Sequence, residues 1–336
     1  MRVDGGLGVD LNTAAEQARE LEAMGYAGAM TAETGHDPFY PLLLAAQSTS
    51  KIELVTSIAV AFARSPMVTA YSAFDLNAFS KGRFVLGLGS QIQAHIEKRF
   101  SMPWSHPAAR MKEYVQAMQA IWHTWMTGER LQFRGKYYTH TLMTPFFTPT
   151  TRDYGAPKVL LAGVGPMMTK VAGEVADGII LHAFSTEKYL REVTLPALEE
   201  GRKKAGKTLE GFEICGPSFV VTGNTEEELE AAKVGTRRQI AFYGSTPAYR
   251  PVLECHGWGE LQTDLNRMSK EGKWEEMGTL IDDEILSTFA VVGEPETIGP
   301  ELDRRYGDVI SRLSFYAPYA GNRDRWQRVL QDMRGA

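Results

Sequence analysis

With 336 residues, of which 43% are hydrophobic and 23% charged, the chain holds enough apolar material for one large core or two ordinary domains. Its formal net charge of −5 argues against a nucleic-acid partner, because no basic patch dominates the sequence. No run approaches the roughly 18 apolar residues of a membrane span. The two cysteines, Cys215 and Cys255, are too few for a disulfide framework or a metal cluster. We therefore expect a cytoplasmic protein with two free thiols.

Apolar runs alternate with helical spacings along the whole chain, which predicts alternating strands and helices. The strands are expected at Arg2–Leu7 and Ala27–Thr31, within the runs Ile52–Pro66 and Gly82–Gln91, and at Lys158–Leu161, Gly178–Leu181, Glu213–Val221, Phe289–Val292 and Ser311–Phe315. The helices are expected at Thr13–Met24, Leu42–Ser48, Met67–Phe79, Ala108–Thr127, Pro166–Ala176, Thr186–Ala205, Glu226–Ile240, Thr297–Tyr306 and Asn322–Met333.

This alternation of about eight strands with helices favours a (β/α)₈ barrel over a doubly wound sheet with a second domain. No glycine- or serine-rich linker divides the chain, so we expect a single domain over residues 1–336. Two segments are longer than ordinary connections. We interpret residues 91–157 as an excursion after strand four and residues 241–283 as an excursion before strand eight.

The third and fourth strands end in small residues. Strand three is followed by Thr56-Ser57-Ile58, and strand four ends in Gly87-Leu88-Gly89-Ser90-Gln91. Ligands of parallel α/β folds bind at the carboxyl ends of the strands, and small side chains let a flat ligand approach the backbone. The region Lys51–Gln91 is therefore our first candidate for a cofactor site.

The same rule about strand ends nominates polar residues elsewhere on the barrel. They are Glu33, His36 and Asp37 after strand two, Ser90, Gln91 and His95 after strand four, and His182 after strand six. Their spacing matches no known metal pattern, and we expect no metal site. His36 has a second interpretation as a hydrogen-bond partner within its loop. In the first excursion, Trp104 and His106 are candidates either for a substrate pocket or for a structural role.

Gly163-Val164-Gly165-Pro166 opens a predicted helix after strand five. Proline suits the first turn of a helix, and free amides approached through glycines favour a phosphate. A tight turn that uses glycine for its geometry alone is the equal alternative. The chain has no Gly-x-Ser-x-Gly elbow and no P-loop lysine motif, so nucleophilic and nucleoside-triphosphate chemistry are not indicated.

Taken in order, these motifs resemble the bacterial luciferase-like oxidoreductases, and within them the actinobacterial group assigned to the deazaflavin coenzyme F420. The resemblance covers nearly the whole chain. Its marks are Ala32-Glu33, Thr56-Ser57-Ile58 with Arg64-Ser65-Pro66, Gly82-Arg83-Phe84 with Leu88-Gly89-Ser90, Ala176-Asp177-Gly178 and Val292-Gly293-Glu294-Pro295. It implies a luciferase-like TIM barrel.

The resemblance also assigns roles to residues. It implies a non-prolyl cis peptide at Ser57–Ile58 that forms a bulge behind the flavin ring, with Glu33 near the polar edge of the ring. Gly89, Ser90 and Gln91 would lie beside the ring or its side chain, and Gly163, Val164, Gly165 and Pro166 would lie at the phosphate. In the family a histidine often follows the acidic residue directly. Here Thr34 follows Glu33 and the histidine comes later, at His36.

We therefore expect an oxidoreductase that transfers a hydride between F420 and a small organic substrate, with His36 as the first candidate for the proton partner and Glu33 as the second. Trp104, His106 and His182 would shape the substrate end. Two alternatives remain open: an FMN-dependent monooxygenase, and a barrel that binds a flavin or another ligand without turnover. The resemblance further implies a homo-oligomer, a dimer or larger, with no nucleic-acid or membrane partner.

Overall fold

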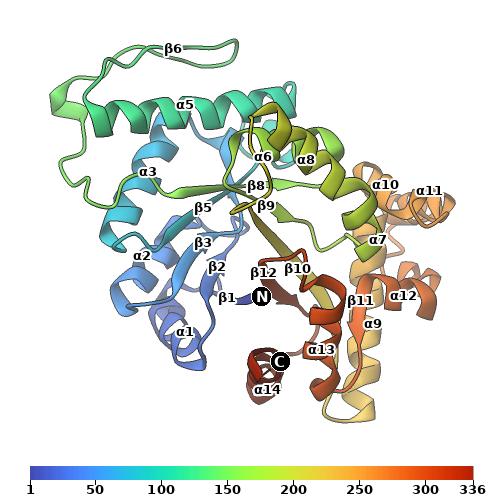
Figure 1. Cartoon of the computed structure of the whole chain (residues 1–336). Helices are drawn as coiled ribbons and strands as arrows, with labels where there is room; N and C mark the ends of the chain where they lie inside the picture. The colour runs from blue at the N-terminus through green and yellow to red at the C-terminus, as the bar shows by residue number, and fades with distance from the viewer. Residues whose placement is uncertain (336) are drawn as a thin grey trace.

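The computed structural model describes residues 1–335, in which eight parallel strands close into a barrel surrounded by helices (Figure 1). The first and last strands pair with each other, so the sheet has no open edge there. In order around the barrel the strands are β1 (Arg2–Gly6), β2 (Gly28–Thr31), β3 (Glu53–Thr56), β5 (Phe84–Gly89), β8 (Lys158–Gly163), β9 (Gly178–Leu181), β10 (Glu213–Val221) and β12 (Arg312–Tyr316). The predicted TIM barrel is confirmed.

Two short strands extend this sheet without being part of the ring. They are β4 (Ala59–Val60), which pairs with the end of β5, and β11 (Ala290–Val292), which pairs with the end of β10. The expected strand at Phe289–Val292 is therefore present, but it pairs with the long β10. Among the described residues it forms no strand pairing with β12.

The helices connect the strands in the expected order. They are α1 (Leu11–Met24), α2 (Phe39–Ser48), α3 (Pro66–Phe79), α4 (Gln93–Lys98), α5 (Pro107–Thr127), α6 (Pro166–Val175), α7 (Glu187–Tyr189), α8 (Leu195–Lys204), α9 (Glu226–Gly244), α10 (Arg250–Glu254), α11 (Gly259–Lys270), α12 (Asp283–Phe289), α13 (Pro295–Tyr306) and α14 (Arg323–Gly335). Among residues 1–335, none of them combines the length and the apolar content that crossing a bilayer requires.

Most helices differ from their predicted bounds by a few residues, and for two of them the structure shows a local reason. The helix expected at Leu42–Ser48 begins already at Phe39, whose backbone N–H donates to the Asp37 carboxylate. The helix expected at Thr186–Ala205 is divided into α7, a π-helical turn at Leu190–Thr194, and α8. Pro196 stands in the first turn of α8, directly after the π-helical turn, so the division falls where proline cannot donate a backbone hydrogen bond.

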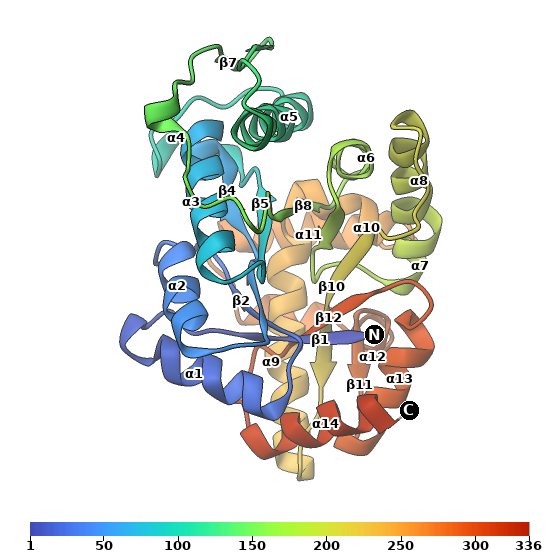
Figure 2. The same cartoon turned by 60° about the vertical axis from the view of Figure 1, so that its left-hand side comes forward.

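The first excursion covers one side of the barrel. It carries α4, α5 and a hairpin of β6 (Phe133–Arg134) and β7 (Thr139–His140), which lies on the outer side of α5 (Figure 2). The Glu113 carboxylate on α5 holds this hairpin by accepting hydrogen bonds from the backbone N–H groups of Lys136, Tyr137 and Tyr138.

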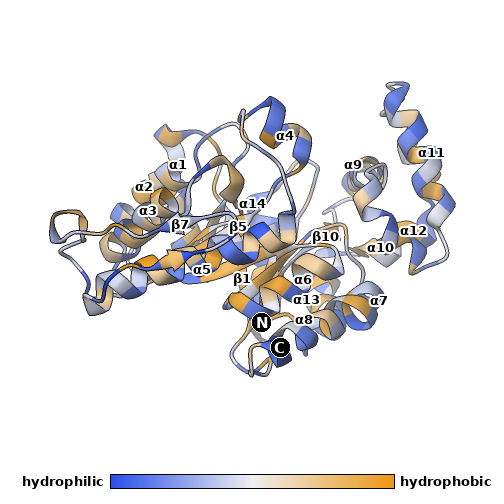
Figure 3. Ribbon diagram, turned by 90° about the horizontal axis from the view of Figure 1, so that it is seen from above, coloured by the Kyte–Doolittle hydropathy of each residue, from blue (hydrophilic) through white to orange (hydrophobic). Residues whose placement is uncertain are grey.

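The second excursion carries α10 and α11 and packs with α9 and α12 on the side of the barrel opposite α1 to α3 (Figure 3). A separate set of buried apolar residues holds it, including Phe184, Phe219, Ile240, Leu265 and Phe289. The end of α9 and the excursion therefore rest on the carboxyl ends of β9 and β10, where a site is expected.

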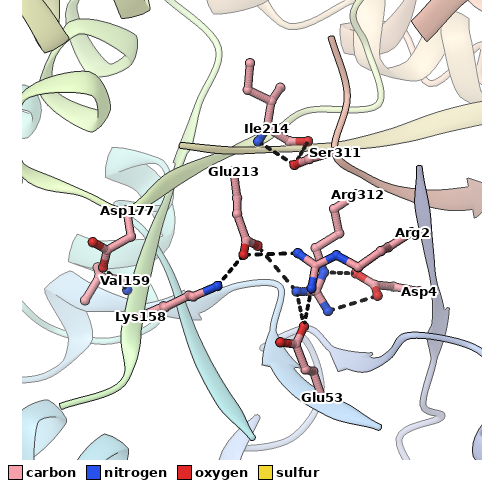
Figure 4. Close-up of polar contacts among 10 residues, drawn as sticks. All are labelled: Arg2, Asp4, Glu53, Lys158, Val159, Asp177, Glu213, Ile214, Ser311 and Arg312. Carbon is pink, nitrogen blue, oxygen red and sulfur yellow. Dashed lines mark hydrogen bonds and ion pairs between the residues drawn. The ribbon is translucent and has the colours of Figure 1, made fainter. Parts of the chain in front are cut away.

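A set of charged side chains near the beginnings of the strands closes the amino-terminal end of the barrel (Figure 4). We call this set the floor cluster. Its members are Arg2, Asp4, Glu53, Lys158, Glu213 and Arg312. Arg312, which is only 1% exposed, donates to both carboxylate oxygens of Asp4 and also to Glu53 and Glu213.

Two observations show how tightly this cluster fills its space. A Cβ added to Gly28 on β2 would lie 2.4 Å from Asp4 Oδ1 and 2.5 Å from Arg312 Nη2, so any larger residue there would displace the ion pair. Burial by itself acts to raise the pKa of Glu213. The hydrogen bond from Lys158 and the positive charges of Arg2, Lys158 and Arg312 outweigh it and hold that pKa below its usual value. The carboxylate of Glu213 therefore stays ionised in the closed floor.

Candidate functional site

The carboxyl ends of the barrel strands meet at one end, which we call the mouth. Below the mouth, five side chains pack against one another inside the barrel: Val55, Val85, Leu160, Ile180 and Cys215. Side chains alternate along a strand, so the residues two positions further on face the same way. These residues are Ser57, Gly87, Ala162, His182 and Pro217. The side of the mouth formed by β3, β5 and β8 is therefore lined by small residues.

The loop after β3 is held close against β5 on this small-residue side. The peptide bond between Ser57 and Ile58, at which the resemblance implies a cis conformation, is cis. A Cβ on Gly87 would lie 1.9 Å from the carbonyl oxygen of Thr56, and one on Gly89 would lie 2.8 Å from Cδ1 of Ile58. Glycine at these two positions is what lets the loop approach, and it brings the predicted Ser57, Ile58 and Gly89 together.

Glu33 anchors that loop from the end of β2. Its buried carboxylate accepts hydrogen bonds from the backbone N–H of Val60 at 2.7 Å and from Arg64 Nη1 at 2.6 Å, while Arg64 Nη2 lies 2.7 Å from Asp37 Oδ2. Burial acts to lower the pKa of Arg64, but Glu33 and Asp37 outweigh it and raise that pKa. The structure thus shows Glu33 as an ion-paired carboxylate that ties the loops after β2 and β3 together.

His36 is half-buried in the loop after β2, and its tautomer follows from its hydrogen bond. Its Nδ1 lies 2.9 Å from the carbonyl oxygen of Asp37. A carbonyl oxygen only accepts, so Nδ1 carries the hydrogen and donates it. In the neutral ring Nε2 then has a free lone pair, which is the form a proton acceptor needs.

Ser90 and Gln91 follow β5 directly. The Ser90 hydroxyl donates to the carbonyl oxygen of Gln91, and the Gln91 side-chain oxygen accepts from the backbone N–H of Ile92. Gln91 adopts a φ of 60°, an uncommon conformation for a residue other than glycine. Such backbone often occurs at functional sites, and here it turns the chain from β5 toward α4.

The segment Gly163–Pro166 forms the start of α6, as predicted. Gly165 precedes the helix and Pro166 lies in its first turn. The first backbone N–H groups of a helix have no intrahelical partner, so those of Met167 and Met168 point out of the helix start. A Cβ on Gly165 would meet nothing within 4 Å, so the turn is not tightly packed at this residue. A helix start of this kind can bind an anion.

His182 belongs to a second side of the mouth, which we call the aromatic wall and which comprises His182, Phe219, Tyr243, Tyr249 and Tyr316. The ring of His182 lies 4.6 Å from that of Tyr243 and 4.7 Å from that of Tyr249, and the hydroxyls of Tyr243 and Tyr316 are 2.8 Å apart. The His182 Nδ1 accepts a hydrogen bond from the backbone N–H of Phe184. Burial lowers the pKa of His182 to about 4.

Trp104 and His106 contact other parts of the first excursion. Trp104 packs edge-on against the buried Phe62, with 5.6 Å between ring centroids. His106, at the start of α5, is exposed and has a φ of 41°. Its ring lies 6.0 Å from the ring of Tyr137 in the hairpin. The contacts of these two residues are with the core and the hairpin, whereas the contacts of His182 are with the aromatic wall.

Sequence reasoning missed most of the aromatic wall. Tyr316 is the last residue of β12 and follows the same strand-end rule that nominated His182. Tyr243 and Tyr249 stand at the end of α9 and in the turn after it, where only the fold reveals that they cover the mouth. Within residues 1–335, no group of three His, Cys, Asp or Glu side chains is arranged to hold a metal ion.

Comparison with known proteins places this geometry in a family. The sequence matches the family model of luciferase-like monooxygenases over residues 2–312. It is 53% identical to an uncharacterized protein of Mycobacterium tuberculosis, over 99% of this chain and 98% of that protein. It is 26% identical to a putative coenzyme F420-dependent oxidoreductase of the same organism, over 86% of each chain.

Solved structures share the fold. The coenzyme F420-dependent tetrahydromethanopterin reductase of Methanopyrus kandleri superposes with a TM-score of 0.82 at 21% identity, covering 100% of this chain and 98% of that one. The EDTA monooxygenase of Chelativorans sp. BNC1 superposes with a TM-score of 0.73 at 14% identity, covering 99% and 92%. The length of the family match, together with the barrel and its glycine-lined mouth, shows that the chain belongs to the luciferase-like monooxygenase family.

Proposed function

We propose that this protein is an oxidoreductase that transfers a hydride between coenzyme F420 and a small organic substrate. The observation that supports it best is the division of the mouth, with small residues and an open helix start on one side and hydrogen-bonding aromatic residues on the other. The related putative oxidoreductase of Mycobacterium tuberculosis and the Methanopyrus kandleri reductase are both named as coenzyme F420-dependent, which supports the choice of cofactor.

The residues on the small-residue side fit a flat ring with a phosphate-bearing tail. Ser57, Ile58 and Gly89 would contact the ring, because Gly87 and Gly89 let the loop after β3 lie close against β5. Ser90 and Gln91 would lie beside the ring, and the helix start at Gly163–Pro166 would bind the phosphate. When bound, the deazaflavin supplies or accepts the hydride.

In this proposal His36 moves the proton that accompanies the hydride. Its Nε2 lone pair takes a proton from a substrate hydroxyl during oxidation and returns it during reduction. Glu33 is already ion-paired with Arg64 and hydrogen-bonded to the Val60 backbone, so its part is to hold the loop on which the ring would rest.

Binding measurements test the proposal directly. Purified protein is titrated with F420 and, separately, with FMN in a calorimeter. We expect F420 to bind more tightly than FMN. Tight FMN binding without any response to F420 would refute the proposal, and it would favour the monooxygenase chemistry named for the related EDTA monooxygenase fold.

Turnover separates an enzyme from a barrel that only binds its ligand. With F420 bound, His36→Ala should abolish turnover across a panel of alcohols and carbonyl compounds and leave F420 affinity nearly unchanged. His123→Ala is the matched control, because His123 is an exposed histidine on α5 whose side chain pairs with Glu129. Unchanged turnover in His36→Ala would remove His36 from the proposal.

A further inference from the structure

In the proposed function the aromatic wall is assigned neither to the ring nor to the phosphate, yet it faces the mouth. His182 continues the inward alternation of β9 after Ile180, and Tyr316 continues that of β12 after Arg312 and Ser314. Ile180 packs inside the barrel with Leu160 and Cys215, and the Arg312 side chain donates to Asp4 on the neighbouring β1, which fixes this direction. The side chains at the next inward positions therefore face whatever binds above the small-residue side.

We propose that His182 and the Tyr243–Tyr316 pair bind the oxygen of an uncharged, ring-bearing alcohol or carbonyl substrate and hold it in the mouth. The inference rests on the proposed function and specifies the class of substrate for that site. His182 and the two tyrosines act here as positioning residues, while His36 remains the candidate for proton transfer.

The hydrogen-bonding state of His182 is the opposite of that of His36. The backbone N–H of Phe184 donates to His182 Nδ1 at 3.0 Å, so this nitrogen has no hydrogen of its own. In the neutral ring the hydrogen is then on Nε2, which becomes a donor. His36 thus offers a lone pair, to which an alcohol O–H can donate, and His182 offers an N–H, which an alcohol or carbonyl oxygen can accept.

The tyrosine pair supplies a second donor. The two hydroxyl oxygens lie 2.8 Å apart, which is a normal hydrogen bond between them. One hydroxyl hydrogen occupies that bond, so the other hydroxyl is free to donate outward. Two neutral donors on one wall match an oxygen with two lone pairs.

The electrostatics of the wall exclude a charged substrate group. Burial alone lowers the pKa of His182 and raises that of Tyr249, and the pKa of Tyr243 is raised by burial and by its tyrosine neighbours. Among the described residues, no lysine, arginine, aspartate or glutamate side chain forms a hydrogen bond or ion pair with a side chain of the wall, whose polar partners are the Phe184 backbone and the two tyrosine hydroxyls. A carboxylate or ammonium group bound here would lose its hydration without gaining a counter-charge.

The body of the substrate is indicated by the rings. Tyr249 is stacked on Phe184, with 5.8 Å between ring centroids and 26° between planes, and Phe184 is stacked on Phe289 at 4.5 Å and 27°. This buried stack fixes Tyr249 beside His182. Aromatic walls of this kind pack favourably against flat or cyclic apolar groups.

Nuclear magnetic resonance of the histidine rings tests the wall independently of the cofactor. In protein labelled at the ring nitrogens, His182 should show the Nε2–H tautomer at neutral pH, assigned by comparison with His182→Gln. Adding benzyl alcohol should shift its Nε2 signal, whereas 4-(hydroxymethyl)benzoate and 4-(aminomethyl)benzyl alcohol, its charged analogues, should not. A signal that stays in place with the neutral probe, or that moves equally with the charged probes, would overturn the proposal.

Kinetics with F420 bound provide the second measurement. His182→Phe and the double variant Tyr243→Phe/Tyr316→Phe each remove one outward donor and keep the rings, so each should raise the KM for a neutral probe about fivefold, which corresponds to one hydrogen bond of about 1 kcal/mol. F420 affinity should stay at the wild-type value, as should both constants in the exposed control His123→Phe. His182→Gln retains an N–H donor and should recover part of the loss.

The two proposals fail in different ways. If wild-type protein does not bind F420, the proposed function fails, but the shift of the His182 signal by benzyl alcohol still decides the role of the wall. If F420 binds and neither Tyr243→Phe/Tyr316→Phe nor His182→Phe changes KM, the wall does not bind the substrate oxygen, and the proposed function stands without it.

Discussion

Replacing Arg312 by methionine removes the cation on which the floor cluster converges. Arg312 is 1% exposed and donates to Asp4, which is 5% exposed, as well as to Glu53 and Glu213. Methionine keeps most of the side-chain length but leaves the Asp4 carboxylate buried without its main partner. Breaking a buried pair by removing one partner typically costs about 3–5 kcal/mol, so we expect a loss of that size.

The assay is urea unfolding at pH 7, followed by tryptophan fluorescence. Arg304→Met is the matched control, because Arg304 is 63% exposed at its side chain and pairs with Glu301, and such pairs contribute at most about 1 kcal/mol. In Asp4→Asn/Arg312→Met the uncompensated carboxylate is neutralised, so part of the lost stability should return. If Arg312→Met unfolds at the same urea concentration as Arg304→Met, the floor cluster does not stabilise the barrel in the way we describe.

Three further predictions concern pH, the helix start and the floor. The pKa of His182 is lowered to about 4, so between pH 7 and pH 5 the unfolded chain binds a proton that the folded chain does not. The free energy of unfolding should therefore fall by about 2 kcal/mol from pH 7 to pH 5. The unfolding midpoint of His182→Phe should depend less on pH over this range. Gly165→Asp adds a negative charge where a phosphate is proposed and should weaken F420 binding roughly five- to tenfold in calorimetry, whereas the neutral Gly165→Asn should have a smaller effect. Gly28→Ala forces a Cβ into the floor cluster and should lower the free energy of unfolding by about 1–3 kcal/mol, while Gly6→Ala, with nothing within 4 Å of the new Cβ, should leave it nearly unchanged.

The barrel could be predicted from sequence because its strands are buried on both faces. Every residue of β5 and of β9 is buried, so both appear as nearly unbroken apolar runs. Strand ends then follow directly, and they located Ser57, Gly89 and His182 on the mouth side. The same logic applies to the helix start at Gly165, where proline and glycine have a local meaning.

The rest of the site depends on contacts between distant parts of the chain. Glu33 and Arg64 are paired across two loops, and nothing in the local sequence of either residue specifies the other. The histidine tautomers depend on backbone partners at Asp37 and Phe184. Tyr243 joins the wall because α9 ends over β10, which sequence periodicity does not encode. Arg312 and its partners are charged residues near the beginnings of separate strands, and only the closed barrel brings them together.

The closed floor also has a consequence for the order of catalytic events. In the described part of the chain the floor cluster and the apolar residues above it fill the amino-terminal end of the barrel, so ligands pass through the mouth. In the proposed function a ring that rests on the Ser57–Ile58 peptide is covered by the substrate, and it must arrive first and leave last. We expect steady-state product inhibition to show this sequence, with the converted cofactor competing against the incoming cofactor and the organic product not competing against its substrate. A random order would mean that the mouth has room for the two ligands to pass each other.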